Sequence, residues 1–238
     1  MTAIILASGT GSRLKPLTDA LPKGLISLTA EKTIIDRIID SLRGQGIQKI
    51  VVTTGFEDRK LSQHIAHNFS DLDIQYCMND QFESTGYIYS LWLTKDFVED
   101  DILLLHADLV FENALLNKLI LSQAKNAVLI KNKQSHIVKD FKARVRDGKV
   151  VEINVDLKGE NVFDSMPIYK FCREDFRRWM NQIEQCINNK KVNCYAEEAL
   201  NLVLPKLELF PEFFEDELCM EIDTLEDLKE AKEQIARL

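Results

Sequence analysis

The sequence lacks the features of several classes of protein. None of its apolar runs approaches the length of a transmembrane helix, and residues 1–7 enter apolar sequence without the basic start of a signal peptide. The net charge of −8 is a deficit of basic residues, whereas a surface that binds nucleic acid needs a surplus of lysine and arginine. We therefore expect a cytoplasmic protein that acts neither on a membrane nor on nucleic acid.

Cysteine and histidine are sparse and dispersed. The five cysteines form no Cys-x-x-Cys pair, which fits a reducing compartment and offers neither a disulfide framework nor a zinc site. Among the four histidines, His64 and His67 lie three residues apart, a spacing more typical of a solvated helix face than of a metal site. The sequence also has no linker, repeat or low-complexity stretch, so we expect one domain over residues 1–238.

Apolar runs and amphipathic stripes alternate along the first half of the chain. The runs predict strands and the stripes, at helical spacing, predict helices between them. The expected strands cover residues 3–7, 49–54, 74–78 and 102–105, and the expected helices cover residues 33–42, 57–69 and 86–97. This rhythm predicts a Rossmann-like α/β fold, with a mostly parallel, mixed sheet flanked by helices on both faces.

The second half is less regular. It predicts strands at 127–130 and 150–153, a turn at Asp147-Gly148, and helices at 174–187 and 196–203. The tail gives a clearer signal, because Thr224 and Asp227 have the spacing of a capping box at the start of a final helix that ends near Ala236.

The first expected strand leads into a loop with two glycines. Residues 8–12 read Ser-Gly-Thr-Gly-Ser, and glycines after a parallel strand let backbone N–H groups approach phosphate oxygens. A Gly-x-Gly by itself is typical of a plain tight turn. The loop is not the dinucleotide fingerprint, because Leu14 stands where the third glycine belongs, and it is not a Walker loop, because Lys23 is far from the glycines.

Two cationic residues make this loop more informative. Arg13 follows the glycines, and Lys23 follows Pro22, which fixes the backbone before the lysine. A reaction at an α-phosphate develops negative charge on the attacked phosphate and on the departing pyrophosphate, so positioned cations stabilise the transition state. A guanidinium can bind the β- and γ-phosphates together, and an ammonium suits the reacting phosphate. We therefore predict Arg13 and Lys23 as the catalytic residues.

Together these motifs resemble the signature of nucleoside-diphosphate-sugar pyrophosphorylases and their relatives, the small phosphocholine cytidylyltransferases of the LicC type. That signature is Gly-x-Gly-x-Arg, then Pro-Leu-Thr and Pro-Lys, after an apolar strand; here it occupies residues 9–13, 16–18 and 22–23. The resemblance implies a nucleotide site on the loop, with the Leu6-Ala7 backbone against the base. The implied nucleotide-binding residues are Leu6, Ala7, Ser8, Gly9, Thr10, Gly11 and Ser12.

A magnesium ion is the expected cofactor, because a triphosphate needs a divalent cation and Mg²⁺ prefers carboxylates, phosphate oxygens and water. The resemblance places metal-binding aspartates at Asp108, after the strand 102–105, and at Asp223, before the last helix. Alternatively, Asp108 is a strand-end cap and Asp223 a helix-start acid that the helix dipole favours. Glu221 is the alternative to Asp223 as a ligand, since alternation along a strand puts both on one face.

The segment from residue 79 to 93 indicates the base. It resembles the Asn…Asn-x-x-Ser-Leu segment of the phosphocholine enzymes and the Ser-Thr-Gly variant of enzymes acting on 2-aminoethylphosphonate. Asn79, Ser84, Thr85 and Gly86 precede a helix, where hydroxyls and backbone donors can bind a pyrimidine edge. These residues complete the predicted nucleotide site and favour CTP.

Aromatic and acidic side chains nearby are candidates for contact with the acceptor, because a cationic amine favours aromatic faces and carboxylates. They are Tyr89, Trp92 and Glu198, with Tyr87 and Glu197 beside them. An aromatic stripe at a helix start is also typical of a core, and an acidic pair is also typical of a solvated helix face. Many relatives carry a second lysine that contacts the acceptor phosphate soon after the strand 150–153. Here that stretch reads Asn-Val-Asp-Leu-Lys-Gly, so either Lys158 is displaced into this role or the role is absent.

The sequence thus predicts a CTP-dependent cytidylyltransferase that joins CMP to a small phosphorylated alcohol, amine, amide or phosphonate and releases pyrophosphate. A general base is not required, because a phosphate is already ionised at neutral pH. The nearest alternative is a sugar-1-phosphate uridylyl- or thymidylyltransferase. An alternative of another class is a nucleotide-binding regulatory module without catalysis. We expect a monomer or a homodimer.

Overall fold

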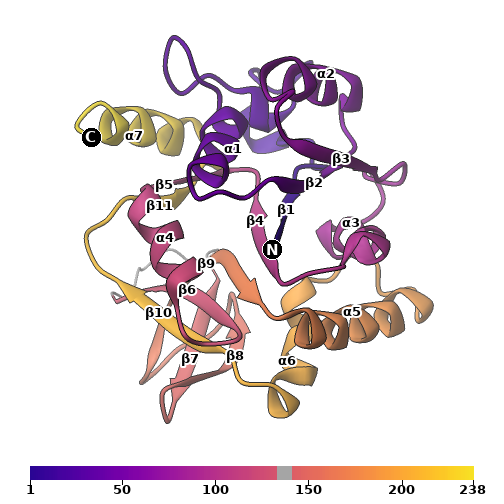
Figure 1. Cartoon of the computed structure of the whole chain (residues 1–238), viewed down its shortest axis with the longest axis vertical. Helices are drawn as coiled ribbons and strands as arrows, with labels where there is room; N and C mark the ends of the chain where they lie inside the picture. Colours follow the sequence, from indigo (N-terminus) through magenta and orange to yellow (C-terminus); the bar gives the residue numbers. More distant parts are fainter. Residues whose placement is uncertain (133–140) are drawn as a thin grey trace.

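The computed structural model describes residues 1–132 and 141–238, and its centre is a nine-stranded sheet (Figure 1). Four strands of the first half lie side by side and parallel, in the order β3-β2-β1-β4. They are β1 (Thr2–Leu6), β2 (Lys49–Thr54), β3 (Asp73–Met78) and β4 (Ile102–His106). Every residue of β1 is buried, because this central strand is covered on both faces.

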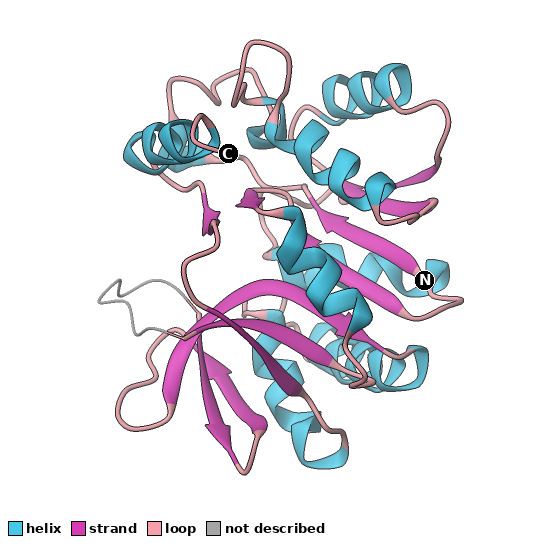
Figure 2. Ribbon diagram, turned by 60° about the vertical axis from the view of Figure 1, so that its left-hand side comes forward, coloured by secondary structure: helices cyan, strands magenta, loops and turns pink. Residues whose placement is uncertain are grey.

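Helices cover both faces of this sheet, as predicted (Figure 2). Alternate residues of β1 belong to two separate hydrophobic clusters, with Ile5 in one and Ile4 in the other. Ile5 packs in the cluster with α1 (Ile34–Gly44), α2 (Asp58–Asn68), α4 (Asn113–Leu121) and α7 (Leu225–Ile235). Ile4 packs in the cluster with α3 (Tyr87–Leu93), α5 (Arg173–Asn188) and α6 (Ala196–Val203).

The second half of the chain extends the same sheet with mixed pairing. β9 (Val162–Phe171) runs antiparallel to both β4 and β6, and β10 is parallel to β6. The hairpin of β7 and β8 turns at Asp147-Gly148 as predicted, with both residues at positive φ. The bounds are β6 (Ala127–Lys131), β7 (Lys142–Arg146), β8 (Lys149–Asn154) and β10 (Phe210–Phe214). One sheet therefore carries strands from both halves, although the single domain stays a prediction.

β9 and β10 were not among the predicted strands. β9 contains Asp164, Ser165 and Pro167, which interrupt its apolar run, and a proline removes one donor from the ladder. Pro167 is tolerated because the pairing of β6 with β9 shifts register between Val128 and Ile130, so the ladder is already irregular there.

A small second sheet fixes the geometry beyond the end of β4. β5 (Leu109–Phe111) pairs antiparallel with β11 (Cys219–Glu221), and the backbone N–H of Ile222 donates to the Asp108 carbonyl at 2.9 Å. The predicted capping box follows, with Thr224 accepting from the Asp227 N–H at the start of α7. This pairing brings Asp108 and the segment before α7 together. The C-terminal helix α7 lies beside α1, which belongs to the N-terminal part of the chain (Figure 1).

The packing of α5 gives a stability prediction. The Trp179 ring is fully buried, contacts Tyr169 and Phe176, and donates from Nε1 to the Ala196 carbonyl at 2.9 Å. Trp179→Ala should lower the free energy of unfolding by about 3 to 5 kcal/mol, measured by denaturant titration. Leu121→Ala, at a side chain that is 65% exposed, should change it by less than about 0.5 kcal/mol. Equal losses in the two variants would contradict this core.

Candidate active site

A pocket of about 250 Å³ lies at the carboxyl ends of β1 and β4. This is the edge of an α/β sheet where ligands bind, because the loops that follow parallel strands meet there. All the predicted loop residues line it, and so do both predicted cations and both predicted aspartates. The lining residues include Leu6, Ala7, Ser8, Gly9, Thr10, Gly11, Ser12, Arg13, Lys23, Tyr87, His106, Asp108 and Asp223.

The loop after β1 depends on Gly11. Its backbone is left-handed, with φ of 61°, and a Cβ there would lie 3.1 Å from Thr18 Cγ2 and 3.2 Å from Lys23 Cβ. The Thr18 hydroxyl donates to the Gly11 carbonyl at 2.8 Å, and this bond ties the loop to Thr18 beside Lys23. Glycine is therefore needed at position 11 for both its backbone conformation and its lack of a side chain. At Gly9 a Cβ would meet nothing within 4 Å, so the backbone is open to a ligand.

Lys23 joins the two predicted aspartates. Its Nζ donates to Asp108 Oδ2 at 2.7 Å and to Asp223 Oδ1 at 2.9 Å. Arg13 Nη2 lies 2.8 Å from the same Asp223 oxygen. Burial by itself lowers the pKa of Lys23, but the two carboxylates outweigh it and hold that pKa above its usual value. Burial likewise opposes the charge on Asp108, yet Lys23 and then His106 keep the pKa of Asp108 below its usual value.

Glu221 lies in the same site but has a different partner. His106, at the end of β4, places Nδ1 3.7 Å from Glu221 Oε1. Burial raises the pKa of Glu221, and the charges of Asp108 and Asp223 add to that effect against the influence of His106. His106 was not among the predicted site residues. Its position two residues before Asp108, at the end of a buried strand, is the signal that indicates it.

The predicted base-binding residues form a network behind the pocket. Asn79 is 1% exposed, and its Nδ2 donates to Thr85 Oγ1 and to Ser90 Oγ, each at 3.0 Å. Ser90 Oγ is hydrogen-bonded at 2.6 Å to Ser8 Oγ on the phosphate-side loop. Gly55 packs against that loop so closely that a Cβ would lie 2.6 Å from the Ser8 carbonyl oxygen. The network therefore holds the position of Ser8.

Asn79, Ser84, Thr85 and Gly86 do not themselves line this pocket. Their contact with a nucleotide stays a prediction. A glycine at position 86 has a structural explanation. Its N–H donates to the Val192 carbonyl at 2.8 Å, and a Cβ there would contact the backbone of residues 193–194.

The aromatic side chain at the pocket is Tyr87. Its ring lies 5.0 Å from that of His106 and 6.2 Å from that of Tyr195. The Tyr87 hydroxyl donates to Glu197, which is 1% exposed and also accepts from Tyr169 at 2.9 Å. Glu197 therefore fixes the position of the Tyr87 ring at the edge of the pocket.

The predicted acceptor-binding residues lie outside this pocket, and their contact with an acceptor stays a prediction. The rings of Tyr89 and Trp92 contact each other at 5.5 Å, and Lys95 lies over Trp92 at 4.3 Å. Glu198 accepts from the Tyr195 N–H and caps its own helix. Neither these three side chains nor Lys158 lines the pocket. Helical spacing explains the difference, because only Tyr87, at the first turn of α3, faces the end of β4.

Comparison with known proteins gives a family. Residues 2–147 match the family profile described as "Nucleotidyl transferase". The chain is 32% identical over 126 residues to UTP–glucose-1-phosphate uridylyltransferase of Haloferax volcanii, covering 53% of this chain and 50% of that one. It is also 32% identical over 136 residues to CTP:phosphoglutamine cytidylyltransferase of Campylobacter jejuni, covering 55% and 52%. The match thus spans about half the length of either curated relative.

A solved structure confirms the fold. The CTP:phosphocholine cytidylyltransferase of Streptococcus pneumoniae superposes with a TM-score of 0.79 over 98% of both chains, at 22% identity. The nine-stranded sheet flanked by helices is therefore a nucleotidyltransferase fold, as the motifs predicted. None of the helices within residues 1–132 and 141–238 combines the length and hydropathy that a bilayer span requires.

The network at Ser8 predicts a coupled loss of stability. Ser90→Ala leaves the Asn79 amide and the Ser8 hydroxyl each short of a partner in a buried place, which should cost about 1 to 3 kcal/mol of unfolding free energy. Thermal or urea unfolding measures it, and Asn79→Ala combined with Ser90→Ala should cost less than the sum of the two losses. Ser84→Ala, at an exposed hydroxyl, is the control. Additive losses would show that the two side chains act separately.

The Lys23 ion pairs predict a pH-dependent effect. Because the folded pKa of Asp108 is lowered, this carboxylate contributes stability that is complete above its unfolded pKa of about 3.9 and lost as the pH falls through its folded value. Lys23→Met should therefore destabilise the protein by about 1 to 3 kcal/mol at pH 7. The difference between variant and parent should shrink in acid. A difference that stays constant from pH 7 to about pH 3 would contradict this assignment.

Proposed function

The chain belongs to the nucleotidyl transferase family, and we propose that it is a CTP-dependent cytidylyltransferase. It joins CMP to a small phosphorylated alcohol, amine, amide or phosphonate and releases pyrophosphate. The main support for transferase chemistry is the network of ion pairs among Arg13, Lys23, Asp108 and Asp223, which lies beside an open glycine loop. Cations and carboxylates together at the end of a parallel sheet can hold a triphosphate and the metal that accompanies it.

Lys23 and Arg13 are the groups that stabilise charge. Without nucleotide they are held by Asp108 and Asp223, which keeps both cations at the mouth of the loop. When a triphosphate binds, Lys23 contacts the α-phosphate, and Arg13 contacts the β- and γ-phosphates that leave as pyrophosphate. The acceptor phosphate attacks in line, and no side chain has to remove a proton from it.

Magnesium is the proposed cofactor, with Asp108 and Asp223 as its ligands. These residues fit the ion, because both carboxylates lie within 3 Å of a single cationic atom, Lys23 Nζ. Asp108 Oδ1 is also buried and has no hydrogen-bond partner among the described residues. When bound, a divalent cation neutralises the triphosphate and the developing charge.

Tyr87, which lines the pocket, and its neighbours Tyr195 and Glu197 behind it support an acceptor with a cationic group. Two aromatic rings lie beside a buried carboxylate whose partners are tyrosine hydroxyls, and this arrangement favours an ammonium over a neutral sugar ring. Two similar proteins carry the names of CTP-dependent cytidylyltransferases, one for phosphoglutamine and one for phosphocholine. Both names fit a small phosphorylated acceptor, and we propose a cytoplasmic location for the enzyme.

The second candidate is a sugar-1-phosphate uridylyl- or thymidylyltransferase. It is favoured by the likeness to the uridylyltransferase of Haloferax volcanii, whose identity to this chain equals that of the cytidylyltransferase from Campylobacter jejuni. The loop and the cations would serve either reaction, because they bind the triphosphate and not the acceptor.

A substrate panel separates the candidates. Purified protein with Mg²⁺ is incubated with CTP, UTP, dTTP or ATP, each with phosphocholine, phosphoethanolamine, 2-aminoethylphosphonate, phosphoglutamine or glucose-1-phosphate, and pyrophosphate is measured. We expect turnover with CTP and a phosphorylated amine, amide or phosphonate. Turnover of glucose-1-phosphate with UTP or dTTP, and none with CTP, would establish the second candidate instead.

The catalytic lysine is tested with the productive pair from this panel. Lys23→Ala should lower kcat by about a hundredfold or more, because it removes a cation from the reacting phosphate. Lys229→Ala, on the exposed side of α7, is the matched control and should keep full activity. A Lys23→Ala enzyme that keeps its turnover would refute a catalytic role for this lysine.

A further inference from the structure

Three side chains with metal-ligating atoms meet beside the Lys23 ion pairs. One ligand atom each from His106, Asp108 and Glu221 lies within 4.8 Å of the others. The backbone enforces this meeting, because Glu221 pairs with Leu109 across the β5·β11 ladder and His106 ends β4. The cluster is therefore built into the strand pairing and does not depend on flexible surface side chains.

Two polar atoms of this cluster are buried and without a partner. Asp108 Oδ2 accepts from Lys23 Nζ, but Asp108 Oδ1 accepts no hydrogen bond within the described chain. The same is true of His106 Nε2, while His106 Nδ1 is 3.7 Å from Glu221, which is too long for a hydrogen bond. Buried polar atoms are normally satisfied, so those left unsatisfied indicate a missing ligand.

The charge of the cluster also favours a cation. Asp108, Glu221 and Asp223 lie together, and Glu197 is buried behind Tyr87. Against these carboxylates stand Lys23 and Arg13, and both contact Asp223. Glu221 is left with His106 as its partner, so the side of the cluster away from Lys23 carries excess negative charge.

We propose that His106, Asp108 and Glu221 form a mixed nitrogen and oxygen site for a first-row transition-metal ion such as Mn²⁺, and that this site shares Asp108 with the proposed magnesium site. Oxygen ligands by themselves suit Mg²⁺, whereas an imidazole nitrogen raises the affinity for softer divalent ions. His106 therefore makes this chain discriminate between Mn²⁺ and Mg²⁺, which an aspartate pair would do weakly. These side chains define the site, so the proposal does not depend on which nucleotide and acceptor the enzyme uses.

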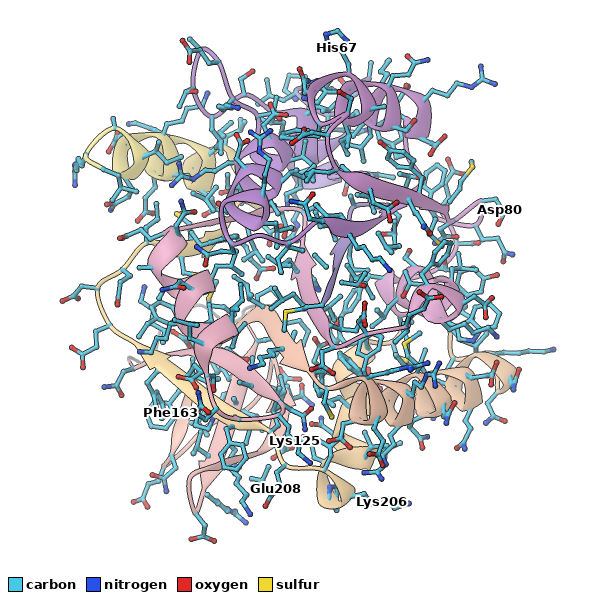
Figure 3. The ribbon with its side chains drawn as sticks, viewed as in Figure 1. His67, Asp80, Lys125, Phe163, Lys206 and Glu208 are labelled. Carbon is cyan, nitrogen blue, oxygen red and sulfur yellow. The ribbon has the colours of Figure 1, made fainter. Side chains whose placement is uncertain are left out.

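Isothermal titration of the nucleotide-free protein with Mn²⁺ or with Mg²⁺ tests the site. The parent protein should bind Mn²⁺ at least about tenfold more tightly than Mg²⁺. His106→Asn should weaken Mn²⁺ binding by about tenfold or more and change Mg²⁺ binding by less than about threefold. The matched control is His67→Asn, an exposed histidine at the outer side of α2 (Figure 3), which should bind both ions like the parent.

The result that overturns the proposal is equal Mn²⁺ affinity in the parent and in His106→Asn, or an equal affinity of the parent for both ions. If His106→Asn fails to fold, pulsed electron paramagnetic resonance of the parent protein loaded with Mn²⁺ decides the matter. A nitrogen coupling of the imidazole type supports the site, and its absence refutes it. Neither measurement needs turnover, so failure here leaves the cytidylyltransferase proposal to its own substrate test.

Discussion

The ammonium of Lys23 is the contact on which the rest of the site depends. It joins Asp108 and Asp223, two carboxylates that are far apart along the chain, and Arg13 reaches the second of them. Like charges cannot be collected at the end of a sheet without compensation, because a buried carboxylate loses its hydration. The lysine supplies that compensation and holds the pKa of the Asp108 carboxyl below its usual value.

The fold supplies the fixed positions that this contact needs. β1 and β4 are parallel neighbours, so the glycine loop and His106-Ala-Asp108 emerge at one edge of the sheet. The short β5·β11 ladder then returns the C-terminal segment to the same edge, where Glu221 and Asp223 enter the site. Next to His106, Tyr87 is anchored by Glu197, which links α6 and α3 to the pocket. Each wall thus comes from an element whose own packing fixes it.

Local signals in the sequence predicted the four parallel strands, the helices α1 to α3 and the loop, because periodicity and glycine geometry depend on neighbouring residues. The capping box at Thr224 and the turn at Asp147-Gly148 were also predicted. β9 was not, since its polar residues and Pro167 are accommodated by a register shift that only the partner strand determines. The contact between Tyr87 and Glu197 was not predicted for the same reason, because a contact between residues 110 positions apart leaves no local pattern. The roles of Asn79 and Thr85 also depend on such a contact, the one between Ser90 and Ser8.

We propose that Lys23 exchanges its two carboxylates for the α-phosphate when a nucleotide binds. A crystal structure of the chain with CTP and Mg²⁺ tests it most directly. The account predicts Lys23 Nζ within hydrogen-bond distance of an α-phosphate oxygen, with Asp108 and Asp223 released to the metal. A complex in which the triphosphate occupies the glycine loop while Lys23 still joins Asp108 to Asp223 would contradict it.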